Sequence, residues 1–178
     1  LDKKKLNERG LSLARLQLAH ERLQLEADGD VEVYFENNVL SHANFIKYSG
    51  INPLFLTDAA DHDAIFTQFS FKLLLDVAHL HVSSCSLGLD FSKQMSALIP
   101  LTDYLHVSDN DGTADTNDYL DGNSTIMQTL AKYNLSGKTV TLETYSNLDK
   151  IQASFEAMHN VLGSMKHRKM INSSDKDN

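Results

Sequence analysis

The hydrophobic and polar positions of the chain follow a pattern typical of strands that alternate with helices. Short apolar runs rich in β-branched and aromatic residues predict four strands: Val31–Phe35, Leu73–Leu75, Tyr104–Val107 and Lys138–Leu142. Apolar residues at helical spacing predict helices around them: Leu11–Ala27, Asp61–Phe69, Phe91–Ile99, Ser124–Tyr133 and a last one that begins after Asn147. This alternation favours an α/β fold in which helices cover a parallel sheet.

The last helix has the clearest periodicity. Asn147 is predicted to cap its first turn. The apolar residues at helical spacing are expected to face the sheet, as are two from the preceding helix: Ile151, Phe155, Met158 and Leu162, with Ile126 and Leu130.

One polar residue stands where each apolar strand stops and a loop begins. These residues are Glu36, Asp76, His106 and Glu143, and by subtraction they are 40, 30 and 37 residues apart. A (β/α) barrel of eight units spends roughly 31 residues on each unit, so the four residues fall one to a unit on the same rim of the sheet. Carboxylates and an imidazole suit Mn²⁺, Mg²⁺, Co²⁺ or Zn²⁺, and three carboxylates at one sheet end are costly without a cation.

Composition narrows the class of protein. The length of 178 residues fits one domain, and 42% hydrophobic residues are enough for a core, which excludes a wholly disordered chain. The formal charge of -8 makes nucleic acid an unlikely partner, and the sequence has no run that predicts a membrane span. The single cysteine, Cys85, fits a reducing, cytoplasmic location. Residues 1–163 are predicted to form the domain, and 164–178 a polar tail.

Several stretches resemble the xylose isomerase-like, or AP endonuclease family 2, superfamily of TIM barrels. They occur in the order of strands five to eight of that barrel: Glu36–Asn38, Leu75–His79, His106–Gly112, Asp115–Asn117 and Thr141–Glu143. The resemblance implies a TIM-barrel type fold of which about four β/α units are present here. The missing half is then expected from a longer gene product, which the non-Met start at Leu1 favours, or from another chain, including a second copy.

The resemblance implies a metal-dependent sugar or sugar-phosphate isomerase or epimerase. Glu36, Asp76, His106 and Glu143 would hold one divalent ion, and Glu36 and Glu143 would also act as the acid/base pair. A cation that bridges a carbonyl and a neighbouring hydroxyl acidifies the C–H bond between them, so carboxylates can remove and return the proton. Three further residues are expected to contact substrate, namely His79, Asn37 and Asp109. His79 could instead be a rim histidine that makes a backbone hydrogen bond, and Asn37 could instead orient Glu36 or form a turn.

Two other functions remain open at this point. One is an endonuclease IV-like metallo-hydrolase, which the acidic balance and Asn117, in place of the histidine of an Asp-x-His motif, disfavour. The other is a non-catalytic fragment of a barrel that retains the polar rim. His81 is expected to be an exposed loop residue, with a residue that supports the site ligands as the alternative.

Overall fold

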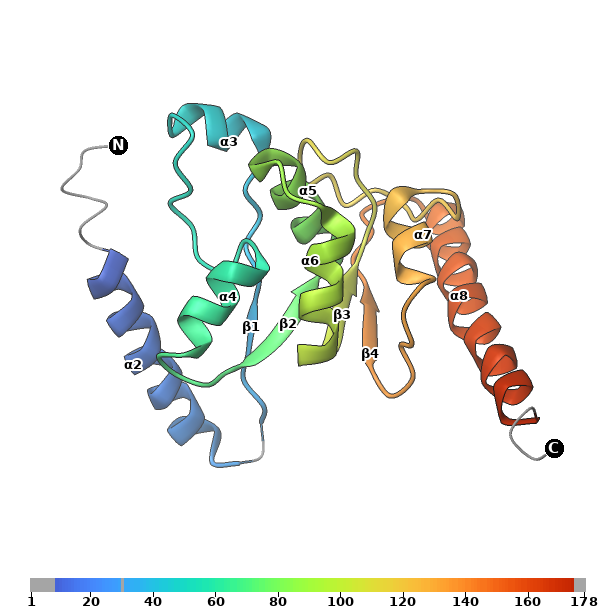
Figure 1. Cartoon of the computed structure of the whole chain (residues 1–178), viewed down its shortest axis with the longest axis horizontal. Helices are drawn as coiled ribbons and strands as arrows, with labels where there is room; N and C mark the ends of the chain where they lie inside the picture. The colour runs from blue at the N-terminus through green and yellow to red at the C-terminus, as the bar shows by residue number, and fades with distance from the viewer. Residues whose placement is uncertain (1–8, 30, 175–178) are drawn as a thin grey trace.

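Four parallel strands form the centre of the structure, a computed structural model that describes residues 9–29 and 31–174, with side chains as far as residue 163 (Figure 1). The strands are β1 (Tyr34–Glu36), β2 (Lys72–Asp76), β3 (Thr102–Val107) and β4 (Thr139–Leu142). Their order in the sheet is their order in the chain, and all three pairings are parallel. The predicted α/β fold with a parallel sheet is therefore confirmed, and each strand lies within a few residues of its predicted position.

Helices precede, connect and follow the strands. They are α2 (Arg9–Ala27), α3 (His42–Lys47), α4 (Ala59–Phe66), α5 (Val77–Leu87), α6 (Phe91–Leu98), the 3-10 turn η1 (Ile99–Leu101), α7 (Thr125–Leu130) and α8 (Leu148–Ser174). Helices α3 and α5 were not predicted, whereas the others overlap their predicted ranges. Helix α8 continues past residue 163, where the sequence predicts the polar tail to begin. Within the described ranges, no helix has both the length and the apolar character needed to cross a membrane.

Side-chain caps explain where most of these helices begin. In each case a serine or aspartate oxygen accepts the backbone N–H three residues further on, which satisfies a donor that the helix itself leaves unpaired. The capping residues are Ser41 for α3, Asp58 for α4, Asp76 for α5, Asp90 for α6 and Ser124 for α7. Asp76 is thus the last residue of β2 and the cap of α5 at once, so the chain turns from strand to helix without a loop.

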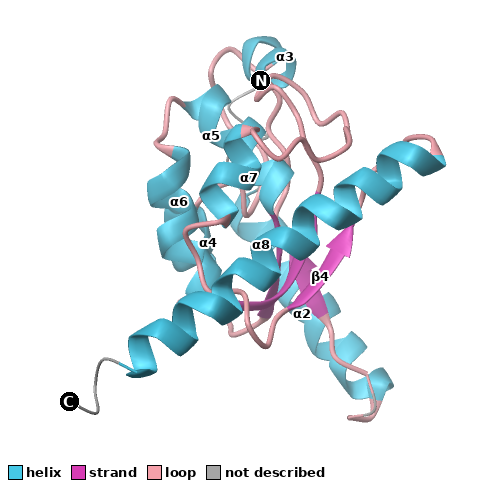
Figure 2. Ribbon diagram, turned by 90° about the vertical axis from the view of Figure 1, so that its right-hand side faces the viewer, coloured by secondary structure: helices cyan, strands magenta, loops and turns pink. Residues whose placement is uncertain are grey.

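The helices cover one face of the sheet, and Figure 2 shows α4, α5, α6 and α7 on the same side of the strands. Alternate strand residues that face these helices are almost fully buried: Leu73, Leu75, Leu105 and Val107. Ile126 and Leu130 of α7 are fully buried against them, as predicted. Each such side chain contributes roughly 1.5–3 kcal/mol of transfer free energy. The other strand face, which includes Tyr104 and His106, is only half-buried.

The prediction for α8 is confirmed in part: Met158 and Leu162 pack against the core, whereas Ile151 and Phe155 do not. Met158 is 3% exposed, but Ile151 is 39% and Phe155 62% exposed. The buried line passes instead through Ser154, whose hydroxyl accepts the backbone N–H of Leu120 at 2.9 Å. The buried Ser154 hydroxyl thus pairs a backbone N–H of the loop that contains Leu120. With Ser154 facing the core, the neighbouring Phe155 points away from it. Asn147 does cap the helix, since its side chain accepts the backbone N–H of Lys150 at 3.0 Å.

Candidate metal centre

The four strand-end residues converge on one point. Glu36 ends β1, Asp76 ends β2, His106 lies one residue before the end of β3, and Glu143 directly follows β4. One ligand atom from each lies within 4.8 Å of every other. The carboxyl ends of adjacent parallel strands meet at one edge of a sheet, and the pairing of Asp76 with His106 places these two side by side. The predicted grouping of these residues agrees with their positions in the structure.

Asp76 is the most firmly held member of the group. Asn37 fixes its backbone in both directions, because the amide oxygen accepts from Asp76 N at 2.7 Å and the amide nitrogen donates to Asp76 O at 3.0 Å. Asp76 Oδ1 accepts the backbone N–H of His79 at 2.7 Å, whereas Oδ2 is buried and has no hydrogen-bond partner among the described residues. Burial raises the pKa of the Asp76 carboxyl to about 6, although the nearby His79 opposes the rise.

A histidine between two glutamates forms the other half of the group. Nδ1 of His106 lies 2.9 Å from Oε2 of Glu143 and 3.6 Å from Oε1 of Glu36. The hydroxyl of Tyr145 donates to the other oxygen of Glu143 at 3.3 Å, and the charge of Glu143 raises the pKa of Tyr145. The side chain of Glu36 is 40% exposed and that of Glu143 29%, so both carboxylates remain accessible to a small molecule.

His79 borders the group from the first turn of α5, not from the end of a strand. Its Nδ1 donates to the backbone oxygen of Asn37 at 2.8 Å, and Nε2 lies 3.3 Å from Oδ2 of Asp115 and 4.0 Å from Oδ2 of Asp76. Burial would lower the pKa of His79, but the carboxylates around it and the hydrogen bond to Asn37 raise it overall. A protonated His79 can donate from both ring nitrogens, which suits this arrangement of acceptors.

The other predicted site residues do not join the group in the same way. Both polar atoms of the Asn37 amide form hydrogen bonds with the backbone of Asp76, so Asn37 orients Asp76 and not Glu36. Asp109 accepts the backbone N–H groups of Asn110 at 3.0 Å and Asp121 at 3.2 Å, so its carboxylate organises the loop after β3. The expectation of an exposed His81 is wrong. His81 is 7% exposed on α5, where Nδ1 lies 2.8 Å from Oδ1 of Asn110.

Two residues near the group were not assigned a role from the sequence. Oδ1 of Asp115 is buried without a described partner, and Oδ2 faces His79. Tyr145 bonds to Glu143 from the loop before α8. Both are in loops that follow strands at the same rim. The sequence placed Asp115 inside a motif but carried no periodic signal that would show which way its side chain points.

The donor set fits a hard divalent cation. Two ligands on opposite sides of an ion at about 2.0–2.6 Å are roughly 4–5 Å apart, which matches the 4.8 Å limit of the group. The buried, unpartnered Oδ2 of Asp76 is costly to leave unpaired, and a cation would satisfy it. Glu36, Asp76, His106 and Glu143 together supply three carboxylates and one imidazole, a set suited to Mn²⁺, Mg²⁺, Co²⁺ or Zn²⁺.

Comparison of the chain with protein-family models, with curated proteins and with solved structures finds no match. The assignment of function therefore depends on the geometry and chemistry of this group of residues. The structure is an α/β fold with a four-stranded parallel sheet, and the carboxyl end of this sheet brings together three acidic residues and a histidine.

Proposed function

We propose that the chain contributes the metal-binding half of a TIM-barrel enzyme that isomerises or epimerises a sugar or sugar phosphate. One observation carries the proposal: the ligand atoms of Glu36, Asp76, His106 and Glu143 lie within 4.8 Å of one another at the ends of four adjacent parallel strands. Active sites of (β/α) barrels are built at this end of the strands. The resemblance of the strand-end motifs to xylose isomerase-like barrels supports the same reading.

The four residues would hold one divalent cation, which would supply Lewis acidity to a carbonyl and a neighbouring hydroxyl of the substrate. Glu36 and Glu143 come from opposite edges of the sheet, β1 and β4. One of them removes the proton from the carbon between the two oxygens, and the other returns a proton. His79 is held by Asn37 through Nδ1, and its Nε2 would exchange the contact with Asp115 for a hydrogen bond to a substrate oxygen.

The barrel part of the proposal is supported by the two edges of the sheet. Each of β1 and β4 has one strand neighbour among the described residues. Exposed large apolar side chains occur in and next to α2 and α8, which Figure 1 places at the two sides of the sheet. They are Leu11, Leu18, Leu23 and Leu25 of α2 with Val31 before β1, and Leu148, Ile151 and Phe155 of α8 with Tyr145 after β4. Further β/α units beside these edges would cover both sets of side chains and pair both strands.

Metal binding is the first test. Titration of the full chain with Mn²⁺, followed by calorimetry and by the electron paramagnetic resonance signal of free Mn²⁺, is expected to give one site per chain. Asp76→Asn should weaken binding at least about 100-fold, because it removes the charge of the buried ligand. Asp103→Asn, on the same sheet but at the opposite end of β3, is the matched control and should bind as the unchanged chain does.

The outcome of that titration separates the alternatives. Absence of saturable divalent-metal binding would overturn the proposal and leave a non-catalytic barrel fragment. Two or three zinc ions per chain would favour a metallo-hydrolase instead, since such enzymes use multi-metal clusters.

Proton exchange is the second test. Ketoses and ketose phosphates are incubated in D₂O with the metal-loaded chain, and nuclear magnetic resonance follows loss of the C–H signal next to the carbonyl. Glu143→Gln should abolish exchange and leave the fold unchanged, because the amide cannot carry the proton. Where the chain binds Mn²⁺ but exchanges no proton, the experiment is repeated in the presence of the polypeptide that supplies the remaining β/α units. No exchange there contradicts the isomerase assignment.

A further test concerns the edges of the sheet. Each buried backbone group without a partner costs about 1–3 kcal/mol, whereas net stability is only about 5–15 kcal/mol. Sedimentation of the isolated chain is therefore expected to show self-association, with a monomer only when additional β/α units lie beside it. A cooperative, fully active monomer of 178 residues would contradict the eight-stranded assignment.

A further inference from the structure

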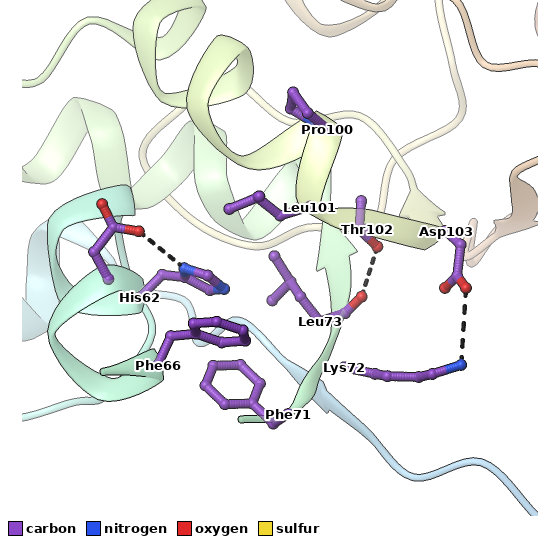
Figure 3. A pocket seen from close by; sticks show the side chains of 10 residues that line it. His62, Phe66, Phe71, Lys72, Leu73, Pro100, Leu101, Thr102 and Asp103 are labelled. Atoms are coloured by element: carbon purple, nitrogen blue, oxygen red, sulfur yellow. Dashed lines mark hydrogen bonds and ion pairs between the residues drawn. The ribbon is translucent and has the colours of Figure 1, made fainter. Parts of the chain in front are cut away.

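A pocket lies at the amino end of β2 and β3, whereas the metal-binding group lies at their carboxyl end (Figure 3 shows the pocket). It is a pocket of ≈ 460 Å³ between α4, the start of β2 and the segment that joins η1 to β3. A volume of this size is in the range of small-molecule sites. The lining residues that matter for its chemistry are His62, Phe66, Phe71, Lys72, Leu101 and Asp103.

Rings form one side of the pocket. His62 stacks on Phe66 with centroids 5.6 Å apart and planes at 14°, and its ring meets Phe71 edge to face at 5.3 Å. Phe66 is 45% exposed and Leu101, on the facing wall, is 52% exposed. Flat apolar surfaces that face one another across a gap favour a planar ring, because aromatic rings gain from offset or edge contacts as well as from burial.

One unpaired polar atom on a buried side chain faces the pocket. The side chain of His62 is 5% exposed, and its Nδ1 lies 3.3 Å from a carboxylate oxygen of Asp63. A carboxylate only accepts, so this contact assigns the proton to Nδ1 and leaves Nε2 of the neutral ring as an acceptor. No described group donates to Nε2, and Figure 3 shows it pointing toward the space between Leu73 and Leu101.

The charges at the mouth disfavour an ionic ligand. Lys72 pairs with Glu32 and lies 4.0 Å from Asp103, so its charge is already neutralised. The hydroxyl of Thr102 donates to the backbone oxygen of Leu73 at 2.6 Å and is not free for a ligand. Asp103 is paired with Lys72 in the same way, and the side chain of Asp63 is 76% exposed, so no charge at the pocket would compensate the desolvation of an ionic ligand.

We infer that this pocket binds a small, uncharged aromatic molecule of one or two rings that carries an N–H or O–H donor. The ring packs against Phe66 and Phe71, and the donor bonds to Nε2 of His62. The inference does not rest on the proposed metal-dependent function, because no residue of the pocket belongs to the metal-binding group.

Indole and 1-methylindole test the inference, since they share a ring system and differ in the N–H donor. The chain contains no tryptophan, so the fluorescence of the added indole can be followed directly. Indole is expected to bind the full chain saturably, and 1-methylindole about fivefold to tenfold more weakly, as expected for loss of one hydrogen bond. Addition of a chelator should change neither affinity.

His62→Phe keeps the stacked ring and removes the acceptor. In this variant the two ligands should bind with equal affinity, whereas the control His42→Phe, at an exposed position on α3, should keep the preference for indole. Circular dichroism checks that each variant is folded, and the two-ligand comparison on the unchanged chain needs no variant. Binding that does not saturate, equal affinities in the unchanged chain, or a preference that persists in folded His62→Phe would overturn the inference.

Discussion

The two ends of the sheet differ in whether the polar groups of the strands have hydrogen-bond or ion-pair partners. At the carboxyl end, Asp76 buries a carboxylate oxygen that has no described partner, and the loops bring further carboxylates toward it. At the amino end, the polar groups of β2 and β3 are paired: Lys72 with Glu32, and Thr102 with the backbone of Leu73. The space left there is lined by rings and leucines.

This difference indicates at which end the strands themselves carry polar groups that lack a partner among the described residues. Unpaired buried polar atoms cost free energy, and a bound cation would offset that cost at Oδ2 of Asp76. The same strands therefore begin in a satisfied, mainly apolar environment and end in an unsatisfied, charged one. Substitutions at the two ends should consequently differ in the size of their effects and in their dependence on pH.

The largest difference is expected between Asn37→Ala and Lys72→Met. Loss of the Asn37 amide removes the partners of two buried backbone groups of Asp76, which should cost about 2–6 kcal/mol in the free energy of unfolding. Lys72→Met removes only an exposed ion pair with Glu32 and should change the free energy of unfolding little, because such pairs contribute little in water. Urea denaturation at a concentration where the chain is monodisperse measures both. Equal costs would show that the carboxyl end is not held by Asn37.

The next largest effect is expected in the pH dependence of stability, which should depend on Asp76 at the carboxyl end of the sheet. The pKa of Asp76 is about 6 in the folded chain, above its ordinary value of 3.8, so the folded state keeps a proton that the unfolded state loses. The associated stability is present below pH 4 and is lost as the pH rises through about 6, by about 3 kcal/mol at most.

The measurement is urea denaturation of the unchanged chain and of Asp76→Asn, both with a chelator present, across this pH range. The free energy of unfolding of the unchanged chain, relative to that of Asp76→Asn, should fall as the pH rises from 4 to 6. With saturating Mn²⁺ it should rise over the same range, because a cation favours the carboxylate. A flat difference curve would contradict the raised pKa.

The strands and their rim residues could be predicted because they carry strong local signals. Runs such as Leu73–Leu75 are apolar throughout, which fits a strand covered by helices, and Asp76 stands directly where the run stops. Once the strands are parallel and adjacent, their last residues must meet at one edge. The position of the candidate site thus followed from strand direction alone.

Other features depended on packing that a single sequence does not encode locally. Helix α5 was not predicted because it is buried on nearly all sides, so its residues show no amphipathic period. His81 was misplaced for the same reason. The exposure of Phe155 depends on the hydrogen bond between Ser154 and a distant loop, and the orientation of Asp115 depends on where α5 places His79.

The smallest expected effect concerns two tyrosines, one at each end of the sheet. The pKa of Tyr145 is raised mainly by the charge of Glu143, whereas burial, together with hydrogen bonds to Asp103 and Glu32, raises the pKa of Tyr34 to about 12. Glu143→Gln should therefore lower the pKa of Tyr145 toward 10 and leave Tyr34 unionised over the same range. Phenolate absorbance, with Tyr145→Phe to assign the signal, follows the change. An unaltered titration of Tyr145 in Glu143→Gln would show that the side chain of Glu143 does not face Tyr145. It would contradict the arrangement of charges described for the carboxyl end of the sheet.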